Sequence, residues 1–258
     1  MKRRELISGG GLSLLSLAIM SPTMAQSQLW PAGHLGAVSF TYDDGLESHL
    51  DVAMPALEHR GMRGSFYVTM QNMAPRLADW VTASTRGHEL ANQTIHHHCG
   101  LPRFTPQKFV SREIAPMEAW PRSLVPADRV PTYAYPCDVT DLGRGSPNRQ
   151  AQRYAWLLAR QGIVAARTSE GAPNRPSTAL RRPYRLQALA DGYDAADVQT
   201  VIDYLASAAR KGHWAILVFH DLIAVPNRSG AVSTDMHRPH FERIWQPFAL
   251  GCSVGEGL

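Results

Sequence analysis

The sequence predicts an α/β fold in which parallel strands alternate with helices and gather into a barrel. Short β-rich runs alternate with stretches of helical periodicity from residue 37 to residue 219, and this order implies a parallel sheet with crossover helices. Three segments rich in Asp and His each follow an expected strand, as sites do at the C-terminal face of a parallel barrel. The 258 residues, 44% of them hydrophobic, suit one domain with a sizeable core.

Strands and helices are expected in alternation along the chain. The expected strands cover residues 37–41, 64–69, 89–92, 132–135, 163–166 and 215–219. The first helix starts near Leu46 and ends at Gly61, and Pro55 indicates a kink or a late start. Further helices are expected at 77–86, 105–120, 150–160 and 198–205. The sequence therefore predicts repeated strand–helix units.

Three later segments depart from this alternation. Residues 168–192 hold several Pro and Arg and are expected to form a long loop, and residues 226–230 form a turn-rich loop. A last helix is expected over 241–250. The tail from residue 251 to 258 lacks the strand that would finish a barrel.

The N-terminal residues 1–25 have the features of a signal peptide. Lys2-Arg3-Arg4 is a basic start, and residues 9–20 are apolar but too short to span a bilayer of about 30 Å. Thr23-Met24-Ala25 offers a small-residue cleavage site, and Arg3-Arg4 resembles a twin-arginine signal. An uncleaved anchor and an ordinary signal remain alternatives. We expect export to the periplasm or the exterior, no stable membrane span, and a single domain over 26–258.

The net charge of +4 is modest, and the arginines are scattered along the chain. Nucleic-acid binding requires a basic stripe with interleaved aromatic residues. We therefore expect no nucleic-acid partner. The oligomeric state is not indicated by the sequence.

The segment Thr41-Tyr42-Asp43-Asp44-Gly45 ends the first expected strand with two adjacent carboxylates. Holding two like charges together is costly, and burial raises their pKa values. Such a pair is typical of a catalytic mouth, where one carboxylate can bind a metal while its neighbour takes a proton. An Asp-Asp-Gly turn without function is the alternative.

Two later segments strengthen the catalytic interpretation. They are Gly87-His88-Glu89-Leu90-Ala91-Asn92-Gln93-Thr94-Ile95-His96-His97-His98 and Ile216-Leu217-Val218-Phe219-His220-Asp221. Together with the Asp pair they resemble the polysaccharide deacetylase family, which is the NodB homology domain or carbohydrate esterase family 4. The resemblance covers roughly residues 36–222. It implies the distorted, incomplete (β/α) barrel of the NodB type.

The resemblance also implies roles for individual residues. Asp43 would be the general base, Asp44 a ligand of a divalent metal, and His220 the general acid for the leaving group. The family's third motif matches Tyr133 to Asp138, so the backbone N–H of Cys137 would face the oxyanion. A buried, structural His is the alternative for His220.

The second motif departs from the family pattern of His-(Ser/Thr)-x-x-His. Gln93 stands where the first metal-binding His belongs, while Thr94 and His97 match. A Gln oxygen is a weaker zinc ligand than imidazole. The metal can bind through Asp44, His97 and weakly Gln93, His96 or His98 can substitute, or the metal can be lost.

The third and fourth motifs are also altered. Ala134 stands where the family has an Arg that orients the catalytic Asp. The fourth motif, Asp-x-x-Asp-Trp, is not found. Asp191 and Asp194 lie in the right region, and Asp194 fits a helix cap better.

Cys99 follows the His cluster, Cys137 follows Pro136, and Cys252 lies near the end of the chain. Few cysteines in an exported protein suit a disulfide. A Cys99–Cys137 bridge and two free thiols are both open. A Cys nucleophile is not expected.

We therefore expect an exported, metal-dependent carbohydrate deacetylase that hydrolyses N- or O-acetyl groups of a polysaccharide, with zinc as the expected metal. Two alternatives remain. One is a catalytically silent carbohydrate-binding relative, because one His, one Arg and the fourth motif are missing. The other is a metal-independent cyclic amidase of the allantoinase-like type.

Overall fold

The computed structural model describes residues 30, 34, 36–101, 104–124, 130–190, 198–223, 232–233 and 253–254. Its main sheet is parallel, with the strand order β5-β4-β3-β2-β1-β6. These strands are β1 (Ala37–Asp44), β2 (Ser65–Val68), β3 (Glu89–Asn92), β4 (Thr132–Ala134), β5 (Ala165–Arg167) and β6 (Trp214–Phe219). The predicted fold class, a distorted and incomplete (β/α) barrel, is confirmed.

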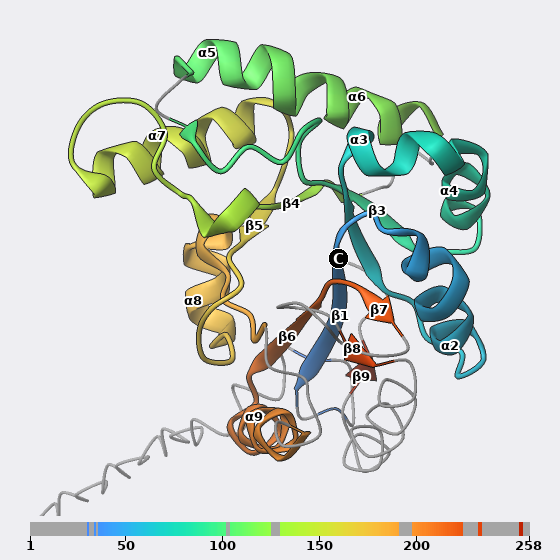
Figure 1. Cartoon of the computed structure of the whole chain (residues 1–258). Helices are drawn as coiled ribbons and strands as arrows, with labels where there is room; N and C mark the ends of the chain where they lie inside the picture. Colours follow the sequence, from blue (N-terminus) through green and yellow to red (C-terminus); the bar gives the residue numbers. More distant parts are fainter. Residues whose placement is uncertain are drawn as a thin grey trace, which may run out of the picture.

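Helices surround the outside of this sheet (Figure 1). They are α2 (Met54–Glu58), α3 (Met70–Met73), α4 (Leu77–Ser84), α5 (Pro106–Phe109), α6 (Ala115–Leu124), α7 (Pro147–Arg160), α8 (Pro176–Arg181) and α9 (Val198–Lys211). A separate pair joins β7 (Leu222–Ile223) to β8 (Val232–Ser233). None of the described helices is long and apolar enough to cross a membrane. The loop expected at 226–230, the helix expected at 241–250 and the signal segment 1–25 lie outside the described residues.

Two of the prolines inside helical stretches, Pro55 and Pro116, closely follow a widened π turn. The turn His49–Ala53 precedes α2 and Pro55, and the turn Val110–Ile114 precedes α6 and Pro116. A proline ring clashes with the carbonyl four residues earlier, and a π turn displaces that carbonyl. The helical stretch therefore continues through both prolines. A π turn stands where Pro55 indicated a kink or a late start.

The prediction of a long loop over 168–192 is partly wrong. The segment holds α8, a 3-10 turn at Pro183–Arg185 and two bridges to the sheet. Leu186 pairs with Arg167 of β5, and Leu189 pairs with Leu217 of β6. Four backbone hydrogen bonds of 2.9–3.1 Å hold it there. Backbone pairing does not need a β-rich side-chain pattern, so the sequence did not reveal that 186–189 spans the barrel's open side.

The prediction that residues 251–258 contain no strand is also wrong, at two residues. Ser253 and Val254 form β9, which pairs in parallel with Ala37 and Val38 at the start of β1. Two paired residues leave too short a pattern for recognition from sequence.

The two faces of β1 have different surroundings. Val38, Phe40 and Tyr42 are buried in the apolar core between sheet and helices. Ser39 and Thr41 instead line a cavity of about 10 Å³ inside the barrel. Side chains alternate along a strand, so Asp43 follows Thr41 into the polar interior and Asp44 reaches the rim.

Candidate active site

Asp44 ends β1 in a left-handed backbone conformation, with φ of 79°. A non-glycine residue adopts this conformation only at a cost, which Asp tolerates better than most residues. Three hydrogen bonds hold it. The Asp44 N–H donates to Gln93 Oε1 (2.7 Å), and the Asp44 carbonyl accepts from Thr69 Oγ1 (3.1 Å) and Asn72 Nδ2 (3.0 Å). The segments that follow β2 and β3 thus fix the backbone of Asp44, and with it the direction of the carboxylate.

Asp43 is 4% exposed and forms a two-point ion pair with Arg167. Arg167 Nη1 lies 3.1 Å from Asp43 Oδ2, and Arg167 Nη2 donates to Oδ1. The guanidinium carbon lies 4.4 Å from the centre of the Tyr67 ring. Burial by itself would lower the pKa of Arg167, but the Asp43 charge raises that pKa above its usual value. Asp43 is therefore held in one orientation.

Arg167 is a site residue that the sequence did not reveal. The predicted fifth strand stopped at Ala166, and the Arg of the family's third motif is missing at Ala134. In the sheet, Ala134 of β4 and Arg167 of β5 are register partners. The guanidinium therefore enters from the adjacent strand at the same level. The detectable signal was an Arg that ends an otherwise apolar strand.

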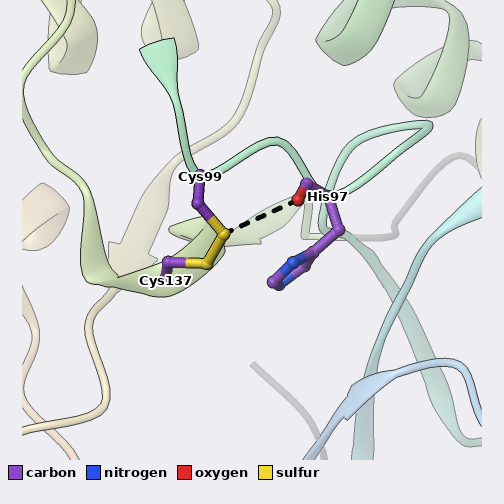
Figure 2. Close-up of side chains that lie close together, drawn as sticks. All are labelled: His97, Cys99 and Cys137. Carbon is purple, nitrogen blue, oxygen red and sulfur yellow. Dashed lines mark hydrogen bonds between the residues drawn. A yellow bond between two sulfur atoms is a disulfide. The ribbon is translucent and has the colours of Figure 1, made fainter.

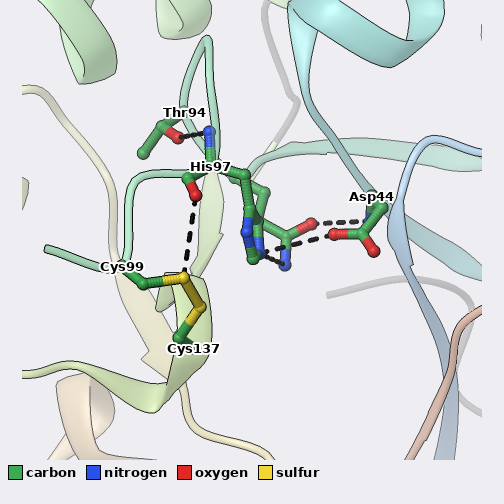
Figure 3. Close-up of a disulfide and its surroundings, with 6 residues drawn as sticks. Asp44, Thr94, His97, Cys99 and Cys137 are labelled. Atoms are coloured by element: carbon green, nitrogen blue, oxygen red, sulfur yellow. Dashed lines mark hydrogen bonds and ion pairs between the residues drawn. A yellow bond between two sulfur atoms is a disulfide. The ribbon is translucent and has the colours of Figure 1, made fainter. Parts of the chain in front are cut away.

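Asp44 and His97 lie close together, and both are residue types that bind metal ions. Asp44 Oδ1 is buried with no hydrogen-bond partner in the described part of the chain, and His97 Nε2 lies 3.4 Å from it (Figure 3). Burial, and then the Asp43 charge, raise the pKa of Asp44, while His97 and His220 oppose the rise. A cation between Asp44 and His97 would satisfy the unpaired oxygen, so these two residues fit a divalent metal.

Gln93 reaches the same place but turns its carboxamide oxygen toward the Asp44 N–H. Its Nε2 lies 3.3 Å from His97 Nε2. With this orientation the amide presents a hydrogen-bond donor, and not a ligand oxygen, to His97. Gln93 therefore positions Asp44 and His97 in this structure.

The loop that follows β3 directs its histidines to different partners. The Thr94 N–H donates to Asn92 Oδ1 (2.8 Å), and the His97 N–H donates to Thr94 Oγ1 (3.0 Å; Figure 3). His97 itself has φ of 52°. His96 and His98 pair with Glu113. The alternative in which either one replaces the missing ligand beside Asp44 does not match this arrangement.

Cys99 and Cys137 form a disulfide, so the bridge considered from sequence is confirmed. Figure 2 shows it beside His97, whose carbonyl oxygen lies 3.9 Å from Cys99 Sγ. Cys137 has φ of 52°, and the next two N–H groups donate to the carbonyls of Tyr135 and Pro136. The Cys137 N–H has no hydrogen-bond partner within the described ranges. It is free to bind an oxyanion.

His220 follows β6, and its Nδ1 is buried without a hydrogen-bond partner among the described residues. Its carbonyl accepts a 2.8 Å hydrogen bond from Nε2 of the fully buried His49. The Leu46 N–H donates to His49 Nδ1 (3.3 Å), which sets the neutral tautomer of His49. His49 therefore anchors the backbone of His220. Asp191 and Asp194 lie outside the described residues.

Residues 33–139 match the model of the polysaccharide deacetylase family. The resemblance inferred from the motifs is confirmed over this segment. Deacetylases of this family generally use a divalent metal. No curated protein matches the chain.

Solved structures share the fold at low sequence identity. The catalytic domain of a peptidoglycan N-acetylglucosamine deacetylase from Eubacterium rectale is 13% identical, with a TM-score of 0.53 over 87% of this chain and 89% of that chain. A family 4 carbohydrate esterase from Streptomyces lividans is 14% identical, with a TM-score of 0.52 over 86% and 93%. A pseudoenzyme of the same family from Bacillus anthracis is 12% identical, with a TM-score of 0.51 over 85% and 63%.

Proposed function

We propose that this protein is an exported carbohydrate deacetylase that hydrolyses N- or O-acetyl groups of a polysaccharide. One observation carries the proposal. A single mouth brings together the oriented Asp43 carboxylate, the donor pair Asp44 and His97, and the unpaired Nδ1 of His220. Acetyl hydrolysis needs a base for water, a stabiliser for the oxyanion and an acid for the leaving group.

Each role falls to a named group. Asp43 accepts the proton of the attacking water. Arg167 donates to both oxygens of this carboxylate and fixes its orientation. The Cys137 N–H donates to the oxyanion. His220 gives its proton to the departing amine or alkoxide, which is the role of a general acid.

A divalent metal, with zinc as our choice, would be held by Asp44 and His97. When bound, it would lower the pKa of water and polarise the acetyl carbonyl. Catalytic zinc sites have three protein ligands as a rule, and this one offers two side chains with Gln93 beside them. We therefore propose a weaker metal site than the family pattern would give.

The cellular setting is part of the same proposal. Residues 1–25 direct export, by the twin-arginine route if the Arg3-Arg4 pair is recognised, and 26–258 form one deacetylase domain. A disulfide beside the site supports an oxidising compartment. The partner is an acetylated carbohydrate, and no nucleic-acid partner is proposed.

The second candidate is the silent carbohydrate-binding relative. Gln93 Nε2 lies within hydrogen-bond distance of His97 Nε2, the atom that would bind the metal. A silent relative would keep the mouth and bind glycan without turnover. The fold is compatible with this outcome, since one similar structure is a pseudoenzyme.

The test is acetate release from a panel of acetylated glycans by purified protein, with and without added zinc. We expect zinc-dependent release by the wild type and none by His220→Ala. Glycan binding without acetate release at any zinc concentration would select the silent relative.

A further inference from the structure

His96, His98 and Glu113 form a second cluster of metal-binding side chains, separate from Asp44 and His97. His96 Nδ1 lies 3.0 Å from Glu113 Oε1, and His98 Nε2 lies 3.5 Å from the same oxygen. One ligand atom from each residue lies within 4.8 Å of the other two. Two imidazoles and one carboxylate are a common ligand set for zinc.

The spacing of these atoms suits one ion. A tetrahedral zinc ion with bonds of about 2.0–2.1 Å separates its ligand atoms by roughly 3.3 Å. The two distances to Glu113 Oε1 lie on either side of this value. Small shifts of the imidazole rings would therefore complete the coordination. We propose that His96, His98 and Glu113 bind a second divalent metal, with zinc as the ion they fit.

The carboxylate is held ready for this role. Glu113 is 3% exposed in the π turn Val110–Ile114. Its Oε2 accepts the His96 N–H at 3.0 Å, so Oε1 is the oxygen turned to the two rings. Burying a carboxylate is costly unless it is paired, and a divalent cation neutralises it more fully than hydrogen bonds do.

The rings are both oriented and accessible. The His98 ring packs against Phe104, with centroids 5.1 Å apart. The side chains of His96 and His98 are 52% and 32% exposed. The ion therefore has a path from solvent, and a water molecule can fill the fourth position.

The second ion would support the loop that carries His97. Asn92, at the end of β3, donates to the Ile114 carbonyl (3.0 Å) and to Glu118 Oε2 (3.2 Å). The start of this loop is therefore already bonded to the helical segment that contains Glu113. The ion would tie His96 and His98 to the same helix and restrict the backbone of His97 between them. Its role is structural.

Metal binding by the full chain in a His97→Ala background tests the proposal, because that substitution removes the first site. Zinc and cobalt(II) are the probes, added singly. His97→Ala protein is expected to bind one equivalent, to raise its Tm on zinc addition, and to show the visible absorption of four-coordinate cobalt(II).

Three further variants complete the test. Adding Glu113→Gln, which keeps an acceptor for the His96 N–H, should weaken zinc binding by about 10-fold or more. Adding His96→Ala with His98→Ala should abolish it. Adding His59→Ala, which removes an exposed imidazole elsewhere, should change nothing. The proposal is overturned if His97→Ala protein binds no zinc, or if removing His96 and His98 leaves binding unchanged.

Discussion

Asp43 and Arg167 neutralise each other inside the barrel, with exposures of 4% and 2%. Removing one partner of a buried ion pair leaves an uncompensated charge and costs about 3–5 kcal/mol. Any substitution at Asp43 therefore combines a chemical effect with a structural one. The two effects can be separated because the Arg167 charge can be removed in the same chain.

Asp43→Asn is expected to lower acetate release by about 10²–10⁴-fold, because the amide cannot accept a proton from water. The same variant should unfold at lower urea concentration. Asp43→Asn with Arg167→Met should recover much of the lost stability and none of the activity. Rates per folded molecule and urea midpoints measure both effects.

Asp51→Asn is the matched control, since the ion pair of Asp51 with Arg76 is exposed. This pair should contribute little to acetate release or to stability in urea. Activity of the Asp43→Asn variant close to that of the wild type would remove Asp43 from the role of base.

Gln93→His restores the imidazole of the family pattern beside Asp44 and His97. A nitrogen ligand replaces an amide whose oxygen is engaged by the Asp44 N–H, so zinc should bind at least about 10-fold more tightly. Wild-type protein should lose zinc to mild chelation. Isothermal titration with zinc, on chains that carry His96→Ala to disable the second cluster, measures this affinity.

Equal zinc affinities for chains with and without the Gln93→His substitution would mean that position 93 does not face the metal. Tighter zinc binding with higher turnover would support the deacetylase. Tighter binding without turnover would favour the silent relative.

At the scale of elements, β1 ends in Asp44, and residues directly after β2 and β3, Thr69 and Gln93, hold its backbone. The π turn His49–Ala53 supports the end of β6. His49 packs against the rings of Tyr42, Phe66 and Trp80, with centroids 5.5–6.3 Å apart. Burial lowers the pKa of His49 to about 4. One buried imidazole thus couples the packing of these elements to pH.

The folded protein should lose stability as the pH falls from about 6.5 toward about 4. The unfolded chain binds a proton at His49 near pH 6.5, whereas the folded chain resists it until near pH 4. The neutral form therefore contributes full stability above pH 6.5, and roughly 3 kcal/mol is lost by pH 4. Urea unfolding at several pH values measures the slope.

His49→Gln keeps a donor for the His220 carbonyl and removes the titration. Its stability should depend less on pH than that of the wild type, while His59→Gln, at an exposed position, should behave as wild type. Parallel pH profiles for the wild type and His49→Gln would contradict the assignment.

At the scale of the whole molecule, the Cys99–Cys137 bridge joins the loops after β3 and β4 across 38 residues. Closing a loop of that length restricts the unfolded chain by about 4 kcal/mol in the loop-entropy model. The same bridge holds the His97 loop beside the Cys137 N–H. Stability and the geometry of the mouth therefore depend on one cross-link.

Cys99→Ser with Cys137→Ser should lower the free energy of unfolding by about 4 kcal/mol and reduce turnover. Peptide mapping without reductant should recover Cys99 and Cys137 linked, and Cys252 free. Cys252→Ser is the control and should leave both properties unchanged. Recovery of Cys99 and Cys137 as free thiols would reject the bridge.

Much of the fold and part of the site follow from local sequence. The expected strand at 89–92 coincides with β3, and the alternation of strands and helices was sufficient to predict the parallel barrel. Asp43, Asp44, His97 and His220 could be proposed as site residues because each lies within a few residues of a strand end. Such patterns depend on neighbours along the chain, which a single sequence displays.

Other features depend on contacts between distant residues. The pairing of Arg167 with Asp43 spans 124 positions and requires the register of β4 with β5. The orientation of the Gln93 amide and the turn of His96 and His98 toward Glu113 require the helix packed beside their loop. Periodicity assigns a residue to a strand or a helix, but only the folded chain brings strands into register and selects the partner that each side chain meets.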